Sequence, residues 1–204
     1  MGIYSELDRL DLISLIDYWQ NVEPLEDREY AASYYSELAF LIVDRGEAGR
    51  LFLREQINNS NNEQLGAILY FFSSKKHPLP LNILLKYLEH KSDYVILNAI
   101  EGLRMQAEKK AKKEVLKLRF HESQYVRGAV LRYLSRLYSK EARSILIEAL
   151  KDPGYIVRES AIDEIEELEI IDFIPYIRPL INDPHPHVRQ AAATAIKYFE
   201  NLND

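Results

Sequence analysis

The fold of this chain is decided by a recurring stretch, which reads DPGYIVRESAIDEI at residues 152–165 and DPHPHVRQAAATAI at residues 183–196. The two copies share an Asp-Pro start, a Val-Arg pair, and small or aliphatic residues at matching positions 31 residues apart. The same interval separates four valines: Val95, Val126, Val157 and Val188. Three of these are followed directly by arginine: Arg127, Arg158 and Arg189. A fixed period of this length is typical of a protein built by repeating one supersecondary unit.

Each period contains two apolar rows separated by a polar break. Aliphatic or small residues follow each valine by four and eight positions, a spacing that keeps them on one face of a helix. A second apolar row stands eleven and seven residues before the valines, and Arg119 is its single misfit. The breaks between the rows, such as 152–154, are rich in turn formers and helix-capping residues. Each unit is therefore expected to be a hairpin of two helices.

These hairpins predict an all-α solenoid. A helical pair of this length cannot bury its apolar face alone, so successive pairs must stack into one continuous core. One further period towards the N-terminus gives a fifth, degenerate unit with residues 58–62 as its turn. Residues 1–47 break the register but read as two helices, at about 5–20 and 27–45. We expect residues 1–47 to cap the stack and residues 48–204 to form one array of about five hairpins.

The signature Leu-Leu…Asp-Pro…Val-Arg…Ala…Leu resembles the short HEAT-like repeats that are named after the phycobilisome lyases. In that family the aspartate and arginine commonly link neighbouring repeats. The resemblance therefore implies that Arg127, Arg158 and Arg189 are structural residues. In two units the aspartate is replaced by His90 and His121, so the link is expected to be weaker there.

A partner would meet the second helix of each pair, which lines the concave side in such stacks. With successive residues about 100° apart, offsets two, six and ten from each valine point outward; offset two includes Gly66 and Gly128. Exposed Leu, Met and Tyr at such positions are typical contact residues. We therefore predict a protein–protein interaction module, an adaptor, assembly factor or inhibitor, that holds a peptide or folded protein on this face. The predicted partner-binding residues are Tyr70, Leu97, Glu101, Met105, Arg132, Arg136, Asp163, Glu167 and Tyr198.

Charge is arranged in stripes along this array, and a second interpretation of the stripes stays open. Opposite charges on neighbouring helices could pair, Arg132 with Asp163 and Arg136 with Glu167. Residues 104–143 carry 12 basic and 4 acidic side chains between acidic flanks, and the net charge is −6. The basic run 109–119 is expected on the first helix, hence on the convex side, as a solvated surface. The acidic balance disfavours nucleic acid as the partner.

The residues offer little for catalysis. There is no cysteine, which excludes disulfides and thiolate chemistry. No phosphate-binding glycine loop, Gly-x-Ser-x-Gly elbow or His-Glu-x-x-His helix occurs, so no catalytic residue, cofactor or metal ligand is predicted. A metal site from His90, His121 and Glu122 is disfavoured because polar turn residues usually cap helices. The acidic pairs 163–164 and 166–167 are expected on solvated helix surfaces.

A rival enzymatic interpretation follows from the resemblance alone. A bilin (tetrapyrrole) lyase or chaperone of the phycobilisome-lyase type would use Arg132 and Arg136 to meet the propionates of its ligand. The repeat is shared by many proteins that are not enzymes, and nothing in these residues specifies bilin chemistry. The first twenty residues lack the pattern of a signal peptide and no apolar stretch is long enough for a bilayer. The expected location is the cytoplasm, without membrane contact.

Overall fold

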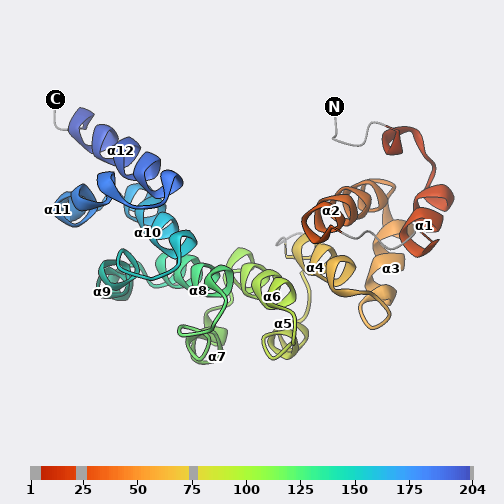
Figure 1. Ribbon diagram of the computed structural model, residues 1–204. Helices are drawn as coiled ribbons and strands as arrows, with labels where there is room; N and C mark the ends of the chain where they lie inside the picture. Colours follow the sequence, from red (N-terminus) through yellow and green to blue (C-terminus); the bar gives the residue numbers. More distant parts are fainter. Residues whose placement is uncertain (1–5, 22–26, 74–77, 203–204) are drawn as a thin grey trace. The chain divides into compact units, whose positions relative to one another are not determined.

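The computed structural model describes residues 6–21, 27–73 and 78–202, and helices are the only regular elements within these ranges (Figure 1). Residue 5, predicted to open the first helix, lies outside them. The prediction of an all-α solenoid of stacked hairpins is confirmed. The chain forms two compact units, Met1–Gln106 and Ala107–Asp204. The predicted domain boundary near residue 47 stays a prediction.

The N-terminal unit is a stack of three helical pairs. Helix α2 packs on α4, and α4 packs on α6. The first pair, predicted to be a cap, thus continues the row of second helices through α2. Gln64 at the start of α4 ties this pair to the next, because its Nε2 donates to the backbone oxygen of the buried Trp19 at 2.7 Å. The elements are η1 Leu7–Arg9, α1 Leu12–Asn21, α2 Arg28–Asp44, α3 Glu47–Gln56, α4 Asn62–Phe71, α5 Leu81–Tyr87 and α6 Asp93–Met105.

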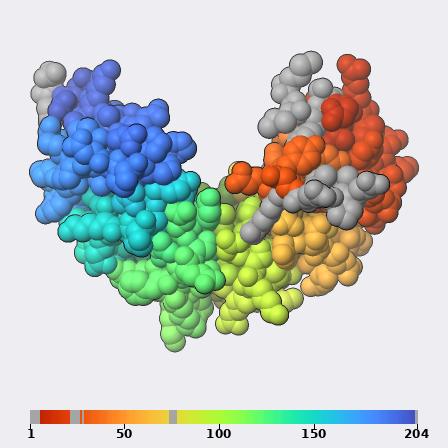
Figure 2. Space-filling view, viewed as in Figure 1, coloured from red at the N-terminus to blue at the C-terminus, as the bar shows by residue number. Residues whose placement is uncertain are grey.

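The C-terminal unit repeats the arrangement, but two of its first helices, α7 and α11, have only 5 and 4 residues. Helices α8, α10 and α12 form one layer in which each packs on the next, and the first helices form a second layer along one side of it (Figure 1). In Figure 2 the surfaces of its hairpins follow one another without a gap from green to blue. The elements are η2 Lys109–Ala111, α7 Lys112–Leu116, α8 Gln124–Leu137, α9 Ser139–Ala149, α10 Tyr155–Glu167, η3 Ile171–Phe173, α11 Ile174–Ile177, η4 Arg178–Asn182 and α12 Pro186–Asn201.

The residues of the 31-residue frame form the core, as predicted. All four valines of the frame are buried, and so are the residues four and eight positions after them. Burying each such aliphatic side chain contributes about 1.5–3 kcal/mol. Because the same positions are buried in every hairpin, each pair covers the apolar side of its neighbour.

Arginines link successive hairpins of the C-terminal unit. Arg127 binds the carboxylate of Asp152 with Nε and Nη2 at 2.9 and 2.6 Å. Arg158 binds Asp183 in the same way at 2.8 and 2.7 Å. In each of these arginines, and in Arg189, Nη1 donates to two carbonyls of the turn before its own helix. The structural role implied for these arginines is confirmed.

The histidines that replace aspartate take over only part of its role. The carboxylate of Asp152 accepts the N–H of Gly154 at 2.7 Å within its own turn. His121 Nδ1 accepts the N–H of Ser123 at 3.1 Å, and His90 Nδ1 accepts the N–H of Ser92 at the same distance. An imidazole that accepts this bond stabilises the turn but offers no carboxylate to a preceding arginine.

Two backbone features set the spacing of particular helices. Gly49 lies so close to the end of α2 that an added Cβ would stand 1.9 Å from the carbonyl oxygen of Ile42. After α6 and α10 the chain turns through Ala107 and Glu169, whose φ angles are 58° and 51°. Glycine adopts this left-handed region without strain, whereas other residues lose about 1–2 kcal/mol.

Candidate functional site

The outward positions of the second helices form the accessible face of each layer, with one correction. Offsets six and ten are accessible in the described residues. At offset two, Gly66 and Gly128 are buried rather than outward. Gly66 is covered by the ring of Tyr94, which an added Cβ would approach to 2.1 Å. Because glycine has no side chain, the neighbouring helix closes over this position.

In the N-terminal unit this face is apolar and aromatic. Tyr70 is 48% exposed on α4 and packs edge to face on Phe71, which in turn lies 6.2 Å from the ring of Phe40 on α2. The predicted residues of α6, Leu97, Glu101 and Met105, are half-buried. Glu101 accepts a hydrogen bond from Arg104 at 2.6 Å. Phe40 belongs to the same surface but was missed because residues 1–47 do not follow the 31-residue frame.

In the C-terminal unit the face is charged, and Arg136 of α8 is fully engaged with acids of α10. Its Nε donates to Glu164 at 2.8 Å and its Nη1 donates to Glu167 at 2.7 Å. The predicted pairing of Arg136 with Glu167 is therefore confirmed. Glu164, expected on a solvated surface, is only 3% exposed. It is buried because Arg136 neutralises its charge, which removes much of the cost of desolvation.

Arg132 lies one turn before Arg136 on the same helix and has a different set of neighbours. Its Nη1 donates to the hydroxyl of Ser160 at 3.2 Å, and its positive charge acts on Asp163. The predicted ion pair between Arg132 and Asp163 stays a prediction, although the charge of Arg132 lowers the pKa of Asp163.

A pocket of about 450 Å³ opens between α10 and α12. Three carboxylates line it on the side of α10, and polar side chains of α12 line the other side. The 31-residue frame predicted Asp163 as an outward position, but it did not single out Glu166 or His187. The lining residues are Glu159, Asp163, Glu166, His187, Gln190, Ala191 and Thr194.

The carboxyl of Asp163 has an unusual affinity for protons. Its pKa is raised from 3.8 to about 6. Desolvation is the largest cause, because the pocket walls limit hydration although the side chain keeps contact with solvent. Repulsion by Glu159, Glu166 and Glu164 raises the pKa further, and Arg132 opposes this shift. The pocket therefore gains stability from a positive charge or a proton placed beside Asp163.

The remaining candidate residues, His90, His121 and Tyr198, make hydrogen bonds within the fold. His90 and His121 both accept backbone N–H groups in their turns. No group of three or more metal-ligating side chains comes together in the described ranges. Tyr198 at the end of α12 donates its hydroxyl to Glu169 at 3.1 Å. Within the same ranges, no helix combines the length and apolar character needed to cross a bilayer.

Stacked hairpins with a regular second-helix face define the class of α-helical repeat proteins. Profiles described as "HEAT repeats" and "HEAT repeat" match residues 81–166 and 173–199. The chain belongs to the HEAT-repeat family. The more specific resemblance to phycobilisome-lyase repeats is not supported by these matches.

Solved structures of repeat proteins share this fold. The E. coli protein YibA aligns with a TM-score of 0.67 at 19% identity, covering 98% of this chain and 77% of YibA. The designed armadillo repeat protein YIII(Dq)4CqI gives a TM-score of 0.53 at 17% identity, covering 93% and 100% of the two chains. A related design solved in complex with the peptide (KR)4 gives 0.52 at 15% identity, covering 96% and 97%. Comparison with curated proteins gives no match.

Proposed function

We propose that this chain is a non-catalytic interaction module that binds a peptide segment of a partner protein along its second helices. The observation that carries the proposal is the pocket between α10 and α12, which is lined by the three carboxylates of Glu159, Asp163 and Glu166. A Lys or Arg side chain of the peptide would enter it, because a cation relieves the repulsion between these carboxylates. The designed repeat protein that was solved with a (KR)4 peptide supports this chemistry, since its fold is similar.

The predicted partner-binding residues have distinct roles within this proposal. In the C-terminal unit Asp163 contacts the cation, and Arg132, Arg136 and Glu167 form the charged border of the site, with Tyr198 at the end of α12. In the N-terminal unit the aromatic surface around Tyr70, with Leu97, Glu101 and Met105, offers contacts for apolar residues. Each unit is proposed as a surface in its own right.

The tetrapyrrole alternative receives no support from the geometry of Arg136. A propionate of the ligand would have to displace Glu164 and Glu167, which already accept hydrogen bonds from the guanidinium of Arg136. Displacing a buried carboxylate from its partner costs about 3–5 kcal/mol. An absorbance spectrum after mixing with bilin tests this alternative: a shifted spectrum that is retained on gel filtration would support it.

The test of the proposal is the binding of a fluorescein-labelled (Lys-Arg)4 peptide measured by fluorescence anisotropy. The double variant Asp163→Asn with Glu166→Gln should weaken binding about tenfold or more, because two of three carboxylates are neutralised. The matched control is Glu141→Gln with Asp172→Asn, which removes the same charge from exposed positions in α9 and η3, where the carboxylates pair with Lys112 and Arg143. If both double variants lose affinity equally, attraction is non-specific and the pocket is not the site.

Proton linkage offers an independent check on the same site. Since the pKa of Asp163 is raised to about 6, the free pocket carries less negative charge at pH 5 than at pH 7. Affinity for the (Lys-Arg)4 peptide should therefore increase as the pH rises through 6. This increase in affinity should be smaller for Asp163→Asn. If both proteins show the same pH dependence of peptide binding, Asp163 is not part of the binding site.

A further inference from the structure

Two adjacent residues of the hairpin α7–α8 invert the polarity found in the other hairpins. Seven residues before the valine the other hairpins have aliphatic residues: Leu88 and Leu150 are each only 4% exposed, and Ile181 of the last hairpin is 39% exposed. This hairpin has Arg119 instead. At the next position the other hairpins have polar residues, Glu89, Lys151 and Asn182, all exposed. Here the residue is Phe120, which is 84% exposed. A core position has thus become charged, and the adjacent surface position has become aromatic.

The inversion is associated with an unfilled apolar pocket. Arg119 turns its guanidinium away from the core to pair with Glu148 of α9, and it also lies over the ring of Phe120 at 5.1 Å. The aliphatic side chain that this position supplies in other hairpins is therefore missing, and a pocket of about 140 Å³ lies beside it. Besides Phe120, its apolar lining consists of the aliphatic residues Val130, Leu131, Ile145, Ala149 and Val157.

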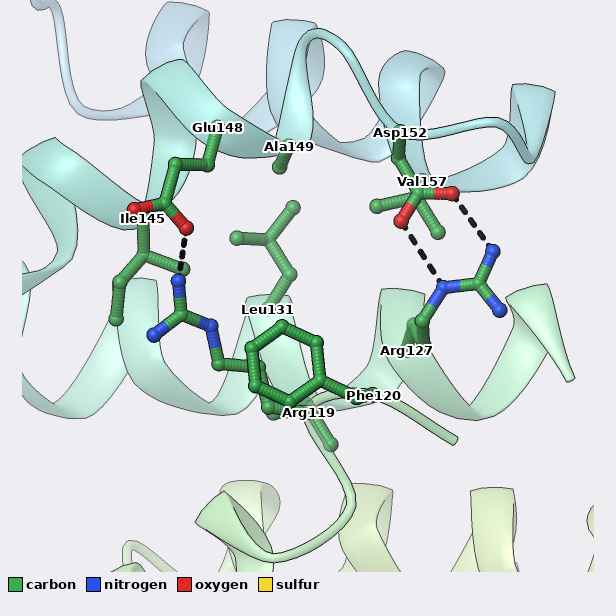
Figure 3. Close-up of a pocket in the computed structure, with 10 residues that line it drawn as sticks. Arg119, Phe120, Arg127, Leu131, Ile145, Glu148, Ala149, Asp152 and Val157 are labelled. Atoms are coloured by element: carbon green, nitrogen blue, oxygen red, sulfur yellow. Dashed lines mark hydrogen bonds and ion pairs between the residues drawn. The ribbon is translucent and has the colours of Figure 1, made fainter. Parts of the chain in front are cut away.

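Phe120 lies at the mouth of this pocket instead of filling it (Figure 3). The ion pair between Arg119 and Glu148 stands on one side, and the pair between Arg127 and Asp152 stands on the other. An apolar cavity of about 150 Å³ accepts a molecule of the size of benzene. The pocket therefore has room for one large apolar side chain, which would also contact the exposed ring of Phe120.

The charge of the segment that carries Arg119 and Phe120 indicates what kind of peptide would supply that side chain. Both acids at the rim, Glu148 and Asp152, are paired with arginines. The segment 107–120 of the same hairpin has six basic and two acidic residues. Its exposed members include Lys109, Lys110 and Lys113. A segment that is acidic on either side of its apolar residue is complementary to this surface.

We propose that the pocket beside Phe120 binds the apolar side chain of an acidic peptide segment from a partner protein. The site lies on the first-helix side of the C-terminal unit, and it is separate from the acidic pocket between α10 and α12. A peptide fits better than a nucleic acid, because the lining is aliphatic carbon and the volume suits one side chain. Phe120 covers the bound side chain, and the lysines attract the acidic flanks.

The experiment uses three labelled peptides with the full chain: EEDELFEEDE, its anchorless analogue EEDEASEEDE, and the basic analogue KKRKLFKKRK. Binding is followed by anisotropy and by the methyl NMR signals of Val130 and Leu131. Of the three peptides, only EEDELFEEDE should shift both methyl signals. The basic analogue should bind the acidic pocket between α10 and α12 instead and leave these signals unchanged. If the anchorless peptide binds as tightly as EEDELFEEDE, the site is only a basic surface and the proposal is overturned. The proposal also fails if the basic peptide binds this site with the same affinity, or if EEDELFEEDE does not bind.

Two variants separate the pocket from the surface charge. Phe120→Ala should lower the affinity for EEDELFEEDE at least tenfold. Tyr176→Ala, which truncates an exposed aromatic residue in α11, should leave this affinity unchanged within twofold. Arg119→Leu restores the residue type of Leu88 and Leu150; it should raise the melting temperature and also abolish the methyl shifts, because the pocket is then filled. A single-stranded oligonucleotide that binds more tightly than EEDELFEEDE and is insensitive to Phe120→Ala would overturn the proposal in favour of a nucleic-acid surface.

Discussion

Replacing Arg158 with leucine tests how strongly the arginine links stabilise the array. The side chains of Arg158 and Asp183 are 11% and 3% exposed, and two hydrogen bonds join them. Arg158 also donates to the carbonyls of Asp152 and Pro153. The variant therefore leaves a buried carboxylate without its cation and removes two further bonds from the turn.

The expected loss is about 3–5 kcal/mol, the usual cost of breaking a buried ion pair by removing one partner. The exposed pair between Lys112 and Glu141 provides the comparison, with side chains 32% and 64% accessible. Lys112→Ala should cost no more than about 1 kcal/mol, because water screens that pair. Asp183→Asn added to Arg158→Leu should recover about 1–2 kcal/mol, since the unpaired charge is then removed.

Urea unfolding followed by far-UV circular dichroism measures these differences, with each variant compared at the same pH and protein concentration. The pKa of Asp183 is lowered, chiefly by its hydrogen bonds from Arg158. The stabilisation should therefore be present at neutral pH and be lost progressively as the pH falls from the ordinary carboxyl pKa through the lowered pKa of folded Asp183. If Arg158→Leu costs no more than Lys112→Ala, or if the double variant is no more stable than the single one, the reasoning is refuted.

Three further predictions concern single positions. Stability should fall as the pH rises from about 4 to 6, because folded Asp163, with a pKa of about 6, still binds a proton that the unfolded chain has released. In thermal melts, the melting temperature of Asp163→Asn should depend less on pH than that of the unmodified protein. Gly49→Ala should cost about 1–3 kcal/mol in urea unfolding, because its Cβ would collide with the backbone of Ile42. In contrast, Gly128→Ala, whose Cβ meets only ordinary contacts at 3.5 Å, should be neutral or stabilising. Ala107→Gly should raise stability by about 1 kcal/mol, as it relieves a positive φ; a lower melting temperature would contradict the assigned strain.

The 31-residue frame predicted the parts of the fold that depend on periodic burial. Val126, Val157 and Val188 are buried at equivalent positions, and the arginines that follow Val126 and Val157 bind the next hairpin, because stacking repeats the same environment at each step. Residues 1–47 have no such register, so the frame could not place Phe40 beside the surface of Tyr70 and Phe71.

The frame was less informative about the candidate site, because exposure depends on neighbours as well as on helical angle. Glu164 is buried only because Arg136 reaches it from the adjacent helix. Gly66 is covered only because Tyr94 lies across it. Arg119 was identified as a misfit in the sequence, but the pocket beside it depends on the direction that its side chain takes. The partner-binding role of the predicted residues stays a prediction.

The direction of the arginine links has a consequence for lengthening the protein. Arg127 and Arg158 each bind their own turn with Nη1 and reach forward with Nε and Nη2 to the aspartate of the following turn. A tandem duplication of residues 153–183 would bring a complete arginine and aspartate of its own, in frame with the 31-residue period. One extra hairpin could thus be inserted after Asp183 without redesigning either junction, which makes the C-terminal unit a scaffold whose length is adjustable in whole repeats.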